Sequence, residues 1–164
     1  LALCLTFILV VGRCRVTSIN RGLSLKELGN LDGAIADFAE AIQLNPQDAD
    51  ARYNRGYARY SIGDLDGALV DYSEAIRLNP RYANAYNNRG LVHYEKGNLD
   101  DALADYTEAI HLDLKDADFY VGRGNTHDTK IDHQRAMADY RKALELNPDH
   151  PDAQIMRDYI KRWG

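Results

Sequence analysis

Residues 49–82 read ADARYNRGYARYSIGDLDGALVDYSEAIRLNPRY, and most of the chain repeats this stretch. The glycine at position 56 recurs every 34 residues, and an alanine and an aromatic residue recur with the same shift. The three sets are Gly22, Gly56, Gly90 and Gly124; Ala34, Ala68, Ala102 and Ala136; and Phe38, Tyr72, Tyr106 and Tyr140. Self-similarity at a period of this size predicts a solenoid of stacked helical units.

Each repeat contains two segments of helical periodicity, which predicts helices near 50–62 and 66–78 in the quoted stretch. Gly63 lies between them, and a glycine there supplies the left-handed residue that ends a helix. Asp66 is the expected N-cap of the second helix, with Asp64 as the alternative, and Pro80 prevents that helix from continuing. The equivalent positions are Gly29 and Gly97 for the glycine, Asp32 and Asp100 for the expected cap, and Asn30 and Asn98 for the alternative.

This pattern of Tyr or Trp, Gly, Tyr, Gly, Ala, Tyr or Phe, Ala and Pro resembles the tetratricopeptide repeat, and the resemblance covers residues 15–150. It implies an all-α fold, a right-handed α-solenoid of four antiparallel helical hairpins. The first helix of each hairpin is then expected to line a concave groove that binds peptides or protein segments. The expected organisation is an apolar segment 1–14, repeats 15–48, 49–82, 83–116 and 117–150, and a capping helix 151–164.

Repeats 3 and 4 depart from the pattern. Repeat 3 has Asp113-Leu114 where the others have Asn-Pro, and repeat 4 has Ile131 at the turn glycine and His133 at a leucine position. Because a β-branched residue avoids the left-handed conformation, we expect a different and looser turn over 130–134.

The last segment predicts an amphipathic helix. Ala153, Met156, Ile160 and Trp163 fall on one face at helical spacing. Such a helix is typical of a terminal cap that shields the final hairpin from water.

Residues 1–11, LALCLTFILVV, carry no charge, and their number is too small for a membrane-spanning helix. The run suits the apolar region of a secretory signal, although no basic residue precedes it. The alternatives are a helix that covers repeat 1 and the remnant of a longer upstream chain. The expected location is cytoplasmic, or exported or membrane-associated if residues 1–12 are a signal.

The net charge of −5 and the absence of a long basic run argue against a nucleic-acid partner. Cys4 and Cys14 both precede the repeats and indicate neither a disulfide framework nor a metal site. No nucleophile–base arrangement or phosphate-binding loop is recognisable, so we expect a non-enzymatic protein without a cofactor.

Two histidines and two aspartates gather near the irregular turn of repeat 4. Such a group can hold a divalent metal, but the spacing fixes no coordination geometry, and a solvated turn is the favoured interpretation. The group is His127, Asp128, Asp132 and His133.

An arginine in the first helix and an aspartate in the second recur together in every repeat. Matched recurrence predicts bidentate bridges between the two helices rather than a row of arginines for an anionic ligand. The pairs are Arg21 and Asp37, Arg55 and Asp71, Arg89 and Asp105, and Arg123 and Asp139.

The groove face is expected to carry asparagine amides, which can pair with a peptide backbone, and tyrosines, which offer a large contact area. Solvent-exposed asparagines without a role and tyrosines partly buried between helices are the alternatives. With Asp50, Glu95, Asp118 and Asp128 nearby, this face favours a neutral to basic partner segment centred on repeats 2 and 3. The predicted groove residues are Asn20, Asp50, Tyr53, Asn54, Tyr57, Tyr60, Asn88, Leu91, Tyr94 and Asn125.

One known subtype of the resembling family, which grips the C-terminal carboxylate of heat-shock chaperones, is not expected here. It uses Lys and Asn in one repeat, Asn in the next, and Lys and Arg in the third. The matching positions in repeats 1–3 are Ile19, Leu23, Asn54, Asn84 and Asn88, and in repeats 2–4 they are Tyr53, Tyr57, Asn88, Asp118 and Gly122. All the required cations are missing, so the carboxylate clamp is expected to be absent.

The favoured function is therefore a protein–protein interaction module that binds a partner segment in the groove. One alternative is self-assembly through the array ends. If residues 1–14 are removed in the mature protein, repeat 1 is expected to present Phe38 and Ile42 near an uncapped end. The other is a substrate-docking fragment of a larger enzyme.

Overall fold

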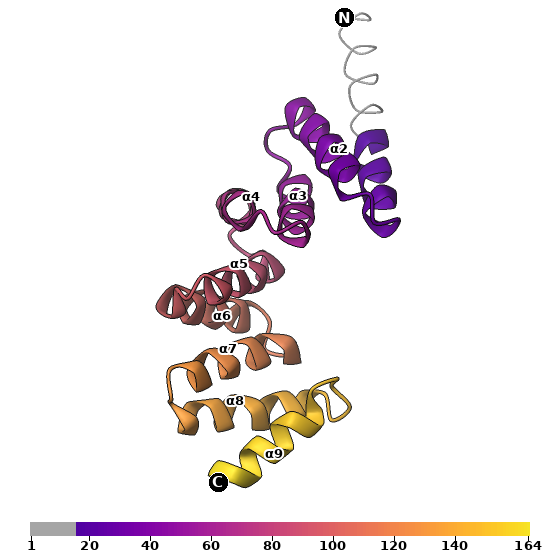
Figure 1. The fold of residues 1–164 in the computed structure, drawn as a ribbon. Coiled ribbons are helices and arrows are strands. Elements are labelled where there is room, and N and C mark those ends of the chain that lie inside the picture. Colours follow the sequence, from indigo (N-terminus) through magenta and orange to yellow (C-terminus); the bar gives the residue numbers. More distant parts are fainter. Residues whose placement is uncertain (1–15) are drawn as a thin grey trace, which may run out of the picture. The chain divides into compact units, whose positions relative to one another are not determined.

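A computed structural model describes residues 16–164, and the predictions made for residues 1–14 lie outside the described residues. The described chain is helical, and none of its helices has the length and apolar character needed to cross a membrane. It divides after Pro80 into two compact units, called here the N-terminal and C-terminal units. After a helix over 16–27, the helices are α2 (Leu31–Leu44), α3 (Ala49–Ser61), α4 (Leu65–Leu78), α5 (Ala83–Glu95), α6 (Leu99–Leu112), α7 (Ala117–Thr129), α8 (His133–Leu146) and α9 (Ala153–Trp163) (Figure 1).

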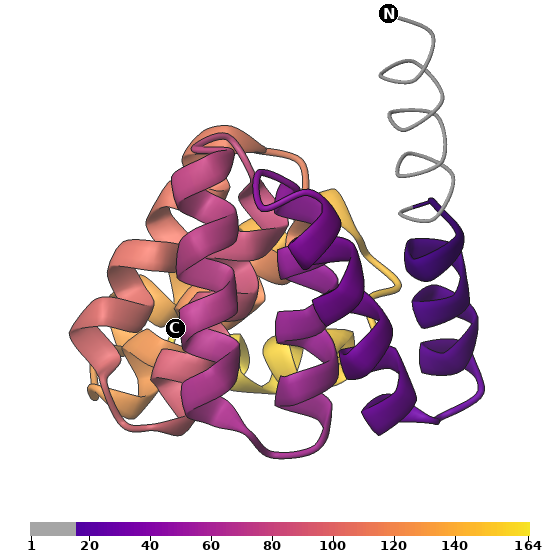
Figure 2. The ribbon, with the colours of Figure 1, turned by 90° about the horizontal axis from the view of Figure 1, so that it is seen from above.

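The N-terminal unit consists of two hairpins, 16–27 with α2 and α3 with α4, and α2 packs on α3 (Figure 2). Ala41, Ile42 and Ala51 form a buried cluster between the hairpins, with Ile19 packed against it. Phe38 is fully buried. Phe38 and Ile42 are thus core residues of this unit, and their place near an uncapped end in a chain without residues 1–14 stays a prediction.

In the C-terminal unit α5 packs on α6 and α7, α7 on α8, and α8 on α9 (Figure 1). Its core contains Phe119, Tyr120 and Tyr140, and Met156 of α9 is buried against the same cluster. Ala153 is also buried, so the face predicted for the capping helix is the face that packs.

The recurring glycine allows the aromatic residue of the second helix to pack against the first helix. A Cβ added at Gly56 would lie 2.9 Å from the Tyr72 ring, and one added at Gly124 would lie 2.7 Å from the Tyr140 ring. Real Cβ atoms do not approach other atoms this closely, so a larger residue would force the helices apart.

The N-caps of the second helices lie two residues earlier than the expected ones, at the positions given as the alternative. The N-caps are Asn30, Asp64 and Asn98, and Asp64 accepts a hydrogen bond from the Gly67 amide at 2.9 Å. The prediction of Asp32, Asp66 and Asp100 as caps is wrong, because these aspartates lie in the first turn, where a carboxylate still stabilises the helix N-terminus.

The irregular turn of repeat 4 keeps the geometry of the other repeats, contrary to expectation. Ile131 adopts a positive φ of 62°, in the same left-handed region as Gly63 and Gly97. Its amide donates to the Asp128 carbonyl at 2.8 Å, as the Gly97 amide donates to Tyr94 at 2.9 Å. These shared hydrogen bonds hold the isoleucine in a strained conformation.

The second departure of repeat 4, His133, is a contact for the capping helix. Its ring stacks on Trp163 with centroids 3.8 Å apart, and its Nδ1 lies 2.6 Å from the Tyr159 hydroxyl. The Tyr159 hydroxyl also donates to Asp128 at 2.6 Å. The other repeats have leucine at this position. In repeat 4 the histidine instead supplies an aromatic face for Trp163 and a polar contact for Tyr159 of α9.

The predicted arginine–aspartate bridges are confirmed. Arg55 donates to both carboxylate oxygens of Asp71 at 2.8 and 2.6 Å, and the pair Arg89 and Asp105 does so at 2.8 and 2.7 Å. Asp71 is completely buried and also accepts from Arg59 at 2.9 Å. The same bridges link Arg21 with Asp37 and Arg123 with Asp139.

Replacing Asp71 with asparagine should cost about 3–5 kcal/mol of folding stability, because two arginines lose a buried partner. The matched control is Glu74→Gln, which removes an ion pair with Arg77 at the exposed surface of the same helix and should shift the denaturation midpoint little. Urea denaturation followed by circular dichroism measures both. Equal midpoint shifts for the two variants would show that the bridge does not hold the hairpin.

Replacing Ile131 with glycine should raise the stability by about 1 kcal/mol, because the left-handed strain is relieved. Little burial is lost, since Ile131 is 76% exposed. The reverse change at the equivalent turn, Gly97→Ile, should lower the midpoint of thermal unfolding. A destabilising Ile131→Gly change would contradict the strained turn.

Candidate functional site

The predicted groove residues of the N-terminal unit lie on two neighbouring helices. Asn20 belongs to the helix over 16–27 and is exposed. Asp50, Tyr53, Asn54 and Tyr57 lie at helical spacing on one face of α3, with Tyr60 one turn further along. Asp50 and Tyr57 are exposed, whereas Tyr53, Asn54 and Tyr60 are half-buried.

A lysine outside the predicted groove residues contacts this face. Lys26 Nζ donates to Asn54 Oδ1 at 3.3 Å and lies 4.9 Å from the centre of the Tyr57 ring. The Asn54 amide nitrogen also donates to the Asp50 carbonyl at 2.8 Å. Both polar ends of Asn54 thus have partners within the chain.

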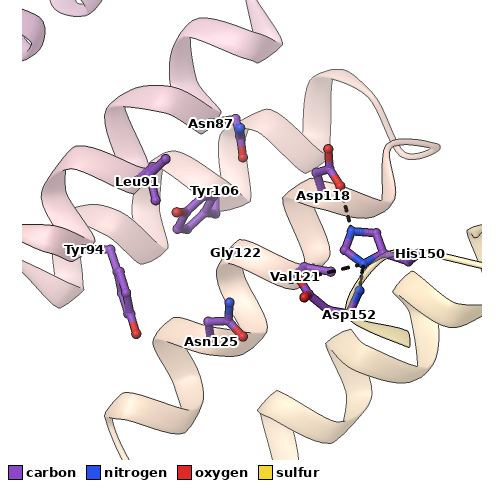
Figure 3. A pocket seen from close by; sticks show the side chains of 10 residues that line it. All are labelled: Asn87, Leu91, Tyr94, Tyr106, Asp118, Val121, Gly122, Asn125, His150 and Asp152. Atoms are coloured by element: carbon purple, nitrogen blue, oxygen red, sulfur yellow. Dashed lines mark hydrogen bonds and ion pairs between the residues drawn. The ribbon is translucent and has the colours of Figure 1, made fainter. Parts of the chain in front are cut away.

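The C-terminal unit carries a pocket of about 250 Å³ at the face formed by α5 and α7 (Figure 3). Leu91, Tyr94 and Asn125, which the sequence predicts for the groove, line it together. Asn88 is not among the lining residues; its Oδ1 accepts from the neighbouring Asn87 amide at 3.2 Å. The lining residues are Asn87, Leu91, Tyr94, Tyr106, Asp118, Val121, Gly122, Asn125, His150 and Asp152.

Gly122 shapes the floor of the pocket. The first three repeats carry asparagine at this position, but a Cβ on residue 122 would lie 2.4 Å from the Tyr106 ring. The glycine therefore lets Tyr106, which is 2% exposed, pack beneath the pocket. Repeat 4 therefore has glycine in place of the asparagine of the other repeats for a packing reason.

Two asparagines present polar groups at the pocket. Tyr140 donates to Asn125 Oδ1 at 2.8 Å, and burial raises the pKa of the Tyr140 hydroxyl, so it remains a donor. The side-chain oxygen of Asn125 is therefore occupied by Tyr140. Its side-chain nitrogen, Nδ2, can donate to another acceptor. The side-chain nitrogen of Asn87 donates to Asn88 Oδ1, which leaves the side-chain oxygen of Asn87 as an acceptor.

His150 forms the opposite wall of the pocket (Figure 3). Its Nδ1 accepts from the Asp152 amide at 3.0 Å, and its Nε2 lies 2.9 Å from Asp118 Oδ1. A ring nitrogen that accepts is unprotonated, so the ring is neutral and its Nε2–H donates to Asp118. The imidazole is 8% exposed and joins the turn before α9 to α7.

His150 and Asp152 were not predicted from the sequence, although a signal for His150 was present. Position 150 corresponds to Asp48 and Asp116, which are N-caps in other repeats. A histidine at position 150 departs from these aspartates, as Ile131 and His133 depart from the glycine and leucine of other repeats.

The pocket is anionic. Of the ten residues that line it, Asp118 and Asp152 are acidic and none is lysine or arginine. Nearby Asp116 accepts from the Asp118 amide, and burial raises the pKa of Asp116, with the neighbouring carboxylates adding to the effect. Asp128, expected on this face, instead contacts Tyr159 of α9 and is not part of the pocket.

The suggested metal cluster of repeat 4 has no support among the described residues. Within 16–164 no group of three or more His, Cys, Asp or Glu side chains is placed to hold a metal ion. His127 is buried, which lowers its pKa, and His133 and Asp128 contact the capping helix.

Comparison with protein families decides the class of this chain. A model described as TPR repeat matches residues 22–63 and 56–97, and models described as tetratricopeptide repeat match 83–116 and 117–150. The chain belongs to the tetratricopeptide repeat family. Its family and fold are those of a protein–protein interaction module. No curated protein sequence gives a significant match.

Solved TPR structures share this fold. A crystal structure of MamA is 28% identical over 82% of this chain and 78% of its own, with a TM-score of 0.78. The Arabidopsis OM64 TPR domain is 29% identical over 70% of this chain and 94% of its own, with a TM-score of 0.67. The first TPR of Spaghetti (RPAP3), bound to the HSP90 peptide SRMEEVD, is 20% identical over 73% of this chain and 94% of its own, with a TM-score of 0.71.

Proposed function

We propose that this TPR protein is a non-enzymatic module that binds an extended, neutral to basic segment of a partner protein along the face of α5 and α7. The observation that carries the proposal is the pocket at that face, lined by Leu91, Tyr94 and Asn125. A volume of about 250 Å³ suits one or two side chains of a partner segment rather than a whole small-molecule ligand.

The side chains at this face supply the contacts that a peptide segment needs. Leu91 and Tyr94 are half-buried, so an incoming side chain that covers them removes further apolar surface from water. The Asn125 amide nitrogen and the Asn87 carbonyl oxygen are a donor and an acceptor for a peptide backbone. Apolar anchors beside amide groups therefore support binding of an extended chain.

The charges at the pocket support a neutral to basic segment. Asp118 and Asp152 would repel an acidic segment, and no lining residue offers a compensating cation. The same charges argue against a carboxylate-terminated peptide such as the SRMEEVD peptide held by RPAP3.

The test selects dodecapeptides from a random displayed library against the whole chain and titrates them against variants. Tyr94→Ala should weaken binding by about 2 kcal/mol, roughly thirty-fold, if the ring is an anchor. The matched control is His111→Ala, at an exposed position on α6, which should leave the affinity unchanged. The SRMEEVD peptide should not compete.

Two results would overturn the proposal. One is that the selected peptides bind Tyr94→Ala and a second pocket variant, Leu91→Ala, as tightly as the unaltered chain. The other is that only His111→Ala loses affinity, which would move the binding surface to the outer helices. Thermal unfolding of each variant checks that the fold is kept.

A further inference from the structure

The two walls of the C-terminal pocket differ in chemical character. One wall consists of Leu91 and Tyr94 of α5, and Tyr106 of α6 forms the floor beside it. The facing wall carries Asp118 on α7 and Asp152 in the turn before α9 (Figure 3). An apolar wall that faces an anionic wall suits a side chain with a long apolar stem and a positive head.

One buried imidazole contacts both aspartates: the carboxylate of Asp118 and the backbone amide of Asp152. His150 Nε2 lies 2.9 Å from Asp118 Oδ1, and its Nδ1 lies 3.9 Å from Asp152 Oδ2. The carboxylates therefore lie beyond opposite edges of one ring. Because Nδ1 accepts the Asp152 amide hydrogen, the ring is neutral and does not cancel either charge.

The arginines of the same helices are already engaged. Arg89 and Arg123 lie on α5 and α7, but they donate to Asp105 and Asp139 within their own hairpins. The carboxylates of the pocket thus face the solvent, with side-chain exposures of 71% for Asp118 and 51% for Asp152. Each can accept further hydrogen bonds from a cationic ligand.

We propose that this pocket binds an arginine side chain of the partner segment, an inference that rests on the proposed function. The stem of the arginine covers Leu91 and Val121, and its guanidinium donates to Asp118 and Asp152. Two separated carboxylates match a planar cation with five donors better than a compact ammonium.

The experiment is a double-mutant cycle between the peptide and the pocket. Each library-selected dodecapeptide that contains arginine is compared with the same peptide carrying citrulline, which keeps the shape but loses the charge. On the unaltered chain the citrulline peptide should bind at least about ten-fold more weakly. On Asp118→Asn/Asp152→Asn the two peptides should bind alike.

A charge-matched control is available in the same unit. Asp149→Asn/Asp158→Asn removes two exposed aspartates outside the pocket, and it should keep the full citrulline penalty. Asparagine at position 118 keeps an acceptor for His150, so the fold is retained, and thermal unfolding checks this. Asp152→Asn alone serves as a second variant.

The outcomes separate the inference from the proposed function. An equal citrulline penalty in both double variants would show a diffuse charge effect and overturn the arginine pocket. The absence of any penalty, with binding still sensitive to Tyr94→Ala, would also overturn it while the proposed function stands. Insensitivity to Tyr94→Ala and Leu91→Ala would reject the proposed function itself.

Discussion

The buried aspartate of each second helix is the feature on which the hairpins depend. A carboxylate without a partner is costly to bury, so each aspartate requires the arginine sixteen residues earlier in the chain. The bridge also fixes the relative orientation of the two side chains, because both carboxylate oxygens pair with one planar guanidinium. It therefore fixes the two helices at the spacing where glycine and aromatic ring meet.

The same bridge influences the surface that we propose for binding. Every first helix carries one arginine at the bridging position, and that arginine is turned inward to the aspartate. The pocket in the C-terminal unit is consequently lined by neutral and acidic side chains alone. A structural requirement of the hairpin thus leaves an anionic face for a partner, which is the electrostatic basis of the proposed function.

The periodic part of the structure was predictable from the sequence, because it depends on local spacing. Helix positions, the glycine–aromatic contact and the arginine–aspartate bridges all follow from residues that recur together. The N-caps were misjudged because two acidic or amide residues compete for each cap. The conformation of Ile131 was mispredicted because the hydrogen bonds of the turn outweigh the preference of isoleucine for a negative φ.

The candidate site was predictable only in part, because it arises where the repeats stop being regular. Leu91, Tyr94 and Asn125 follow from their place on the first helices. Gly122, His150 and Asp152 gain their roles from contacts with other elements, which a repeat pattern does not contain. In the N-terminal unit the contact of Lys26 with Asn54 and Tyr57 is of the same non-periodic kind.

The proposed function requires that the face of α5 and α7 in the C-terminal unit binds the partner segment. Its most direct test is nuclear magnetic resonance of the isotope-labelled chain during titration with a selected peptide. We expect amide shifts to concentrate at Leu91, Tyr94, Gly122 and Asn125, while the shifts of exposed residues of α6 and α8 such as His111 and Arg141 stay unchanged. Shifts that concentrate on α6 and α8 and spare the pocket would contradict it.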